Sequence, residues 1–145
     1  MIYNHTQKGN LIIIISIFLA LYFGFILTKA GFNSRILIIM ALVLIILASF
    51  STLNVQIDEI YLRIKFGYGL VKRSFLLKEI TSAKTVRNHW YYGWGIRYWF
   101  WPKMRIFNVS GFDAVEIKMV DNKVYRIGTD EPKKLEQILV EVIKK

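Results

Sequence analysis

Few residues in this chain are of the types that catalyse reactions or bind metals. There is no cysteine, and the two histidines, His5 and His89, are too far apart in the sequence to show the spacing of a metal-ligand pair. Asp130 and Glu131 could form an acid pair, but they stand directly before Pro132, where acidic residues and proline are typical of the start of a helix. The residue types therefore favour a protein that is not an enzyme and that holds no metal or cofactor.

The densest cluster of one residue type is aromatic. Residues 89–102 read HWYYGWGIRYWFWP and contain all four tryptophans of the chain. The pair Gly93 and Gly95 does not stand between a strand and a helix, so no phosphate-binding loop is indicated. Core packing, insertion among lipid headgroups and contact with a partner are the open interpretations of this segment.

Four consecutive aromatic residues in this segment cannot all face one side of a strand, so some of them must be exposed. Exposed apolar patches usually form a contact. We therefore expect the first half of the segment to be structural, with Trp94 and Ile96 in the core. The expected membrane or partner contact consists of Arg97, Tyr98, Trp99, Phe100, Trp101 and Lys103.

Two uninterrupted apolar runs lie in the first third of the chain. Residues 11–27 and 36–50 contain no charge, and with their flanks each approaches the roughly 20 residues that cross a bilayer. A second run directly after the first, with no cleavage site between them, favours a retained transmembrane hairpin over a removed signal peptide. The expected spans are about 11–28 and 36–52. Two helices buried in a soluble core are the alternative, but their uninterrupted Ile and Leu would leave no polar face for water.

Basic residues set the expected orientation. The chain carries 20 Lys and Arg against 10 Asp and Glu, and all but three of the basic residues follow Phe50. Lys29 and Arg35 lie in the connection between the runs, so the immediate flanks do not decide the orientation. The basic part after the second run, beginning with Arg63 and Lys65, favours the cytoplasmic side. We expect a cell-membrane protein with two spans and a cytoplasmic C-terminal domain.

A basic domain held at a bilayer is expected to be attracted to anionic lipid. Lys72 and Arg73 are the expected lipid contact, whereas the turn at Asp58 and Glu59 would repel the phosphates of an inositol lipid. Basic residues interleaved with aromatic ones can also bind nucleic acid, but a membrane anchor is an unusual setting for that function. The expected partners are membrane lipids and an unidentified protein or peptide, with no nucleic acid and no small-molecule substrate.

From residue 53 onward, apolar residues recur first with the period of strands and then with that of a helix. Alternation predicts seven strands, at about residues 53–57, 60–66, 70–77, 80–87, 105–109, 113–120 and 123–127. Four apolar residues then follow at helical spacing: Leu135, Ile138, Leu139 and Val142. A C-terminal helix with this stripe is expected to cover the open end of a small barrel. The expected domains are a hairpin at residues 1–53 and a strand-rich domain at residues 54–145.

Three short blocks resemble a group of bacterial membrane proteins. The blocks are GWGIR at 93–97, VSG with AVEI at 109–117, and RIGTDEP with Leu135 at 126–135. They are similar to the pleckstrin-homology-like (PH-like) domain of the sublancin-immunity-protein type, in which two N-terminal membrane helices precede a small domain. The resemblance implies an α+β membrane protein with a PH-like antiparallel β-barrel of about seven strands, capped by a C-terminal α-helix. Immunity to a secreted peptide is one use known within the group, although a fold does not define a function.

These expectations combine into a non-catalytic, membrane-anchored PH-like binding module. It is expected to act by protein contact at the membrane face, with bacteriocin immunity as one use. The alternative is an accessory or scaffolding subunit of a membrane complex, in contact with anionic lipid. Neighbouring genes for a bacteriocin precursor and its exporter would favour immunity over the subunit.

Overall fold

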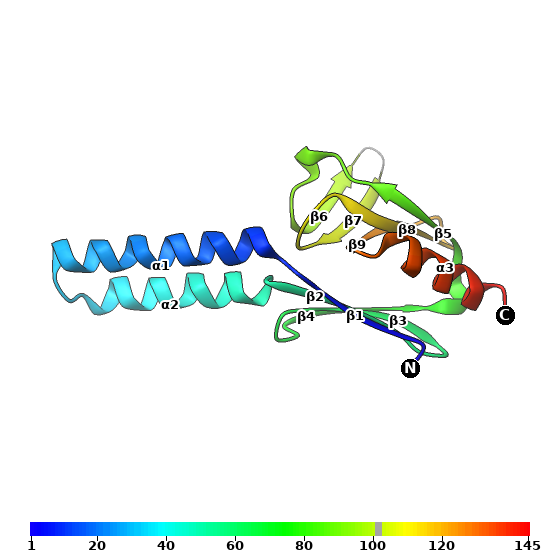
Figure 1. The fold of residues 1–145 in the computed structure, drawn as a ribbon, viewed down its shortest axis with the longest axis horizontal. Helices are drawn as coiled ribbons and strands as arrows, with labels where there is room; N and C mark the ends of the chain where they lie inside the picture. The colour runs from blue at the N-terminus through cyan, green and yellow to red at the C-terminus, as the bar shows by residue number, and fades with distance from the viewer. Residues whose placement is uncertain (101–102) are drawn as a thin grey trace.

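The fold is α+β, with two open sheets and a pair of apolar helices that extends from one end (Figure 1). The computed structural model describes residues 1–100 and 103–145. The first sheet has the order β1-β2-β3-β4, formed by Tyr3–Lys8, Thr52–Ile57, Tyr61–Phe66 and Val71–Leu76. The second has the order β5-β8-β9-β7-β6, formed by Ile80–Arg87, Asp113–Met119, Val124–Gly128, Lys103–Asn108 and Gly95–Phe100. The helices are α1 (Asn10–Ala30), α2 (Ser34–Ser49), α3 (Pro132–Ile143), and the short 3-10 turns η1 (Leu77–Glu79) and η2 (Trp90–Tyr92).

The seven strands predicted from the sequence are present as β2 to β5 and β7 to β9. Neighbouring strands are antiparallel, except that β7 and β9 run parallel. The expected single barrel of about seven strands is replaced by two open sheets: η1 separates β4 from β5, and within the described residues no strand of one sheet pairs with the other. Two strands, β1 and β6, are additional. The first is almost entirely polar and the second nearly continuously apolar, so neither shows the alternation that identifies a strand.

The core lies between the two sheets. Along β2, buried residues from Leu53 to Ile57 alternate with half-buried polar ones, as expected for a strand with one face toward the core. The predicted turn follows, and the Asp58 carboxylate closes it by accepting hydrogen bonds from the backbone N–H groups of Ile60 and Tyr61. Those two bonds hold the pKa of Asp58 below its ordinary value. A charged residue at this position is therefore a structural part of the first sheet.

Helix α3 packs against β5, β8 and η1. Its predicted apolar stripe is confirmed, with two fully buried and two partly buried members: Leu135, Leu139, Ile138 and Val142. Outside this stripe, the Glu136 carboxylate accepts hydrogen bonds from the backbone N–H of Thr85, at 2.8 Å, and from the Thr85 hydroxyl. Helix α3 is thus joined to the edge strand of the second sheet by both apolar packing and a carboxylate.

Helices α1 and α2 are inserted between two paired strands. Lys8, the last residue of β1, pairs with Thr52, the first residue of β2, and the Gly9 N–H donates to the Ser51 carbonyl at 2.6 Å. The two helices lie side by side and point away from the sheets (Figure 1). The two sheets with the core between them form a sandwich, and its first strand, β1, precedes the helices in the sequence. Residues 3–8 therefore belong to the first sheet together with residues 52–76.

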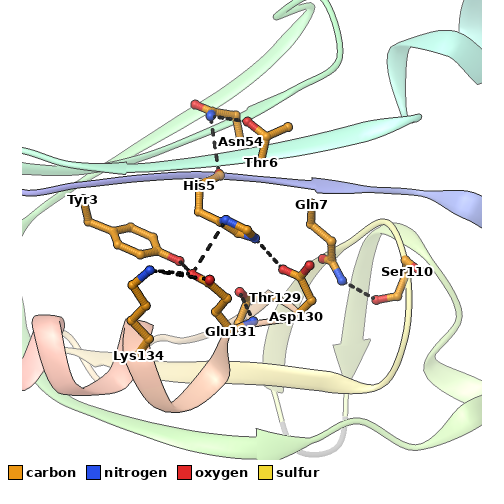
Figure 2. A network of polar contacts seen from close by, with 10 residues as sticks. All are labelled: Tyr3, His5, Thr6, Gln7, Asn54, Ser110, Thr129, Asp130, Glu131 and Lys134. Atoms are coloured by element: carbon orange, nitrogen blue, oxygen red, sulfur yellow. Dashed lines mark hydrogen bonds and ion pairs between the residues drawn. The ribbon is translucent and has the colours of Figure 1, made fainter.

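A network of polar contacts fixes β1 against the chain around the start of α3 (Figure 2). His5 contacts both neighbouring carboxylates, Nε2 to Asp130 and Nδ1 to Glu131, the second at 3.7 Å. The Tyr3 hydroxyl donates to Glu131 at 3.3 Å, and burial together with this carboxylate raises the pKa of Tyr3. Lys134 completes the group through an ion pair with Glu131 at 3.2 Å. Asp130 and Glu131 were expected to cap the start of the helix, but the Glu131 side chain makes no capping hydrogen bond, and both carboxylates instead hold β1 in place.

Candidate contact surfaces

The surface of the helix pair is apolar all the way round. Helix α1 has no buried residue, and Ser49 is the single buried residue of α2. The large exposed apolar side chains include Ile14, Ile17, Phe18, Leu21 and Phe25 on α1, and Ile38, Ile39, Leu42, Ile45 and Ile46 on α2. One helix of the described chain, α1, is long and apolar enough to cross a membrane by length and composition, while α2 is shorter. The structure does not contain two helices buried in a soluble core, because the rest of this chain covers neither α1 nor α2.

The aromatic segment forms a small second cluster on the outer face of the second sheet. Tyr92 of η2 is buried with Met104 and Ile106 of β7, and Trp99 packs partly buried against them. The rings of Tyr92 and Trp99 lie 4.8 Å apart. Trp99, which the sequence assigned to an exposed contact, is therefore largely an internal packing residue, since it covers the face of β7 opposite to the core.

The structural half of the segment differs from the expectation at both of its residues, because neither belongs to a core cluster. Trp94 is half-buried, with its ring 6.2 Å from that of Phe112, and its Nε1 is buried with no hydrogen-bond partner among the described residues. Ile96 was expected in the core, but it is 38% exposed. The reason is that β6 is the outermost strand of a five-stranded sheet, opposite a sheet of four strands.

The register of β6 and β7 shows where the exposed side chains point. Tyr98 lies opposite Arg105, and Phe100 lies opposite Lys103, so these four residues share one face of the sheet. Two positions further along β7 on that face is Phe107, which belongs to the core. Tyr98 and Phe100, with rings 5.0 Å apart, are 49% and 75% exposed. The predicted exposure of both is confirmed, whereas Trp101 lies outside the described residues.

A basic groove opens beside these residues, between β4 and the β7–β9 part of the second sheet. Its volume is about 460 Å³, and its lining includes the cationic residues Arg73, Lys103, Arg105 and Lys123. Asp121 is the one acidic residue of the lining, and its carboxylate pairs with Lys123 at 3.0 Å. This pairing lowers the pKa of Asp121 and raises that of Lys123, so both are charged at neutral pH.

The groove combines residues that the sequence placed in two separate contacts. Arg73 was expected to act with Lys72, but successive residues of β4 point to opposite faces, and Lys72 instead lies opposite Lys65 on the outer face. Arg73 meets Lys103 in the groove. Arg97 is also on another face, where its Nε donates to the Trp94 carbonyl at 3.2 Å.

The lipid and partner contacts expected from the sequence did not include two members of the groove, Arg105 and Lys123. Alternation along 105–109 was a signal for the first of them, because it places Arg105 on the same face as the core residue Phe107. No local signal identified Lys123, which reaches the groove through the turn that joins β8 to β9.

The described residues contain no cluster of three or more His, Cys, Asp or Glu side chains placed to hold a metal ion. Comparison of the chain with protein-family models, with curated proteins and with solved structures finds no match.

Proposed function

We propose that the protein is a non-catalytic binding module that α1 and α2 anchor in the cell membrane as a two-span hairpin. The observation that supports this proposal is that the helix pair exposes apolar side chains of both helices, and the rest of the chain does not cover them. The 21 residues of α1 are about 32 Å long, which matches the hydrocarbon thickness of a bilayer. The 16 residues of α2 are about 24 Å long, and the flanking Phe32 and Phe50 extend its apolar length.

In this arrangement the sandwich rests directly on the membrane surface. Strands β1 and β2 enter α1 and leave α2 as a hydrogen-bonded pair, so no flexible linker separates the sheets from the anchor. The basic character of the residues that follow α2 supports a cytoplasmic position for the sandwich. Anionic lipid is then the nearest oppositely charged surface.

Two residues of η2 are well placed to touch the lipid headgroups. Trp90 is 76% exposed and Tyr91 is 49% exposed. Along the long axis of the molecule, η2 lies at the end of the second sheet that is nearest to the helix pair (Figure 1). Amphipathic Trp and Tyr rings are favoured at the membrane–water interface. This surface is additional to the one predicted from the sequence, which began at Arg97.

Protein contact at the membrane face is the activity that we assign to the module. The exposed edge formed by Tyr98 and Phe100 supports it, because aromatic side chains on an open strand are typical of interface hot spots. Peptide immunity is the use suggested by the resemblance of the GWGIR and RIGTDEP blocks to PH-like proteins. A subunit role in a membrane complex would use the same edge.

Quenching of tryptophan fluorescence tests the headgroup contact in the intact protein. The full chain is reconstituted into vesicles whose lipids carry bromine close to the headgroup. We expect substitution Trp90→Phe to remove a large part of the quenching, because Trp90 is exposed on η2. Substitution Trp94→Phe is the matched control and should leave quenching nearly unchanged, since this ring is half-buried against Phe112. Equal quenching in the wild type and in Trp90→Phe would contradict the contact.

A further inference from the structure

The basic groove holds cationic side chains that the protein itself does not neutralise. Of its four cationic residues, only Lys123 takes part in an ion pair among the described residues, and its partner Asp121 also lines the groove. Arg73, Lys103 and Arg105 have no carboxylate partner within the described part of the chain. The lining therefore has a net charge of +3, concentrated in one recess rather than spread over a solvated face.

Both arginines of the groove are held in position by aromatic rings. The Arg73 guanidinium lies 5.9 Å from the ring centre of Tyr125 and 6.0 Å from that of Phe75. The Arg105 guanidinium lies 5.9 Å from the ring centre of Tyr98. A cation–π contact restricts a guanidinium while its N–H groups stay available for an anion, so less conformational freedom is lost on binding.

We propose that this groove binds a phosphate group, in the form of a phosphate monoester. The planar donor forks of two arginines and the point charges of two lysines suit a dianion with three exposed oxygens better than a single carboxylate. The volume of about 460 Å³ is in the range of small-ligand pockets and exceeds the needs of a lone ion. The exposed rings of Tyr98 and Phe100 beside the groove provide an apolar surface for the group that the phosphate esterifies.

The phosphate monoester can come from a soluble metabolite or from a lipid headgroup, and the groove recognises the chemistry that the two share. This site goes beyond the membrane module proposed above, because it lies on a different face from η2 and does not require the hairpin. Binding in detergent, with no bilayer present, therefore tests the groove separately from membrane contact.

Isothermal titration of the full chain in a neutral detergent measures the site directly. Two probes distinguish the sources: inorganic phosphate stands for the free ligand, and short-chain phosphatidic acid stands for the lipid headgroup. We expect saturable binding of at least one probe with a dissociation constant below about 1 mM. Binding of both probes would indicate that the phosphate monoester is a soluble molecule. Binding of phosphatidic acid alone would indicate that it is a lipid headgroup.

Two double variants of equal charge change locate the binding. Arg73→Gln with Arg105→Gln removes two charges from the groove, and we expect it to weaken binding at least about tenfold. Lys65→Gln with Lys72→Gln removes two charges from the outer face of β3 and β4, opposite to the face that carries Arg73. We expect this variant to change the dissociation constant by less than about twofold. Lys103→Gln, at an exposed position, is a second groove variant, and we expect it to weaken binding without disturbing the packing.

The proposal is overturned by either of two results. One is the absence of saturable binding for both probes. The other is equal weakening by the groove variant and the outer-face variant while circular dichroism shows both folded, because general charge attraction would then explain the binding.

Discussion

At the scale of single residues, one carboxylate joins the C-terminal helix to the second sheet. Glu136 accepts hydrogen bonds from the backbone N–H and the hydroxyl of Thr85, and these bonds hold the pKa of Glu136 below its ordinary value. A group whose pKa is lowered by folding stabilises the folded state above its unfolded pKa, and the contribution is lost as the pH falls through the folded pKa. Docking of α3 should therefore weaken in acid.

Thermal unfolding at a series of pH values tests this link. We expect Glu136→Gln to lower the melting temperature of the full chain in detergent at neutral pH. The difference from the wild type should close as the pH falls through the pKa of Glu136, because the wild-type carboxyl is then also neutral. Glu141→Gln is the control, since its partner Lys145 is exposed and 3.8 Å away. A difference that is the same at every pH would contradict the role of the carboxylate.

The sequence predicted that some aromatic and basic side chains would be exposed, but it did not predict on which face of the sheets each of them lies. The expected exposure of Tyr98 and Phe100 is confirmed, because a run of aromatic residues in a strand must place alternate rings on opposite faces. The prediction that Ile96 lies in the core was wrong because the second sheet is one strand wider than the first. The number of strands in each sheet cannot be inferred from the residues around Ile96. Lys72 and Arg73 are adjacent in sequence, but the strand directs them to opposite faces.

At the scale of elements, the helix pair interrupts a β-hairpin between its two strands. Tyr3 of β1 is 5% exposed, and Gln7 is 6% exposed with its amide donating to the Ser110 carbonyl. β1 therefore contributes buried packing and cross-sheet hydrogen bonds, although it stands 44 residues before β2 begins. A strand-rich domain cut at residue 54 would lack this strand and leave the edge of β2 open.

Two shortened proteins test the contribution of β1. The first joins residues 1–9 to residues 51–145 through a two-residue Asn-Gly turn, which suits paired strands whose ends lie as close as Gly9 and Ser51. The second consists of residues 51–145 alone. We expect the first to melt cooperatively without detergent, and the second to melt at least about 5 °C lower or to aggregate. Equal melting temperatures would show that β1 is dispensable.

Most elements of the fold were predictable, and the exceptions have a physical cause. Seven strands and α3 follow from alternation and from helical spacing, since each has one face on the core. β1 carries the polar sequence YNHTQK and is held by its pairing with β2 and by the network around His5. β6 owes its place to pairing with β7. The pairing of β1 with β2 joins segments that are far apart in the sequence, so it leaves no local pattern in β1, and the nearly continuous apolar sequence of β6 hides its alternation. The groove likewise joins residues of separate strands.

In the molecule as a whole, the fold carries three different surfaces that could contact other molecules. These surfaces are the apolar helix pair, the exposed aromatic residues of η2 and the basic groove. The direct connection of β1 and β2 to the helices makes the orientation of the sandwich depend on that of the helix pair. The proposed membrane contact of η2 therefore depends on whether the helix pair spans the membrane.

Labelling of single cysteines in intact cells tests the proposed two-span hairpin, since the chain has no cysteine of its own. Asn33→Cys lies in the connection between α1 and α2, and Lys144→Cys follows α3. We predict that the full chain sediments with membranes until detergent is added. A membrane-impermeant maleimide should label Asn33→Cys from outside, and should label Lys144→Cys only after the cells are permeabilised. Recovery of the chain in the soluble fraction, or equal labelling of both positions in intact cells, would contradict the membrane-anchored account.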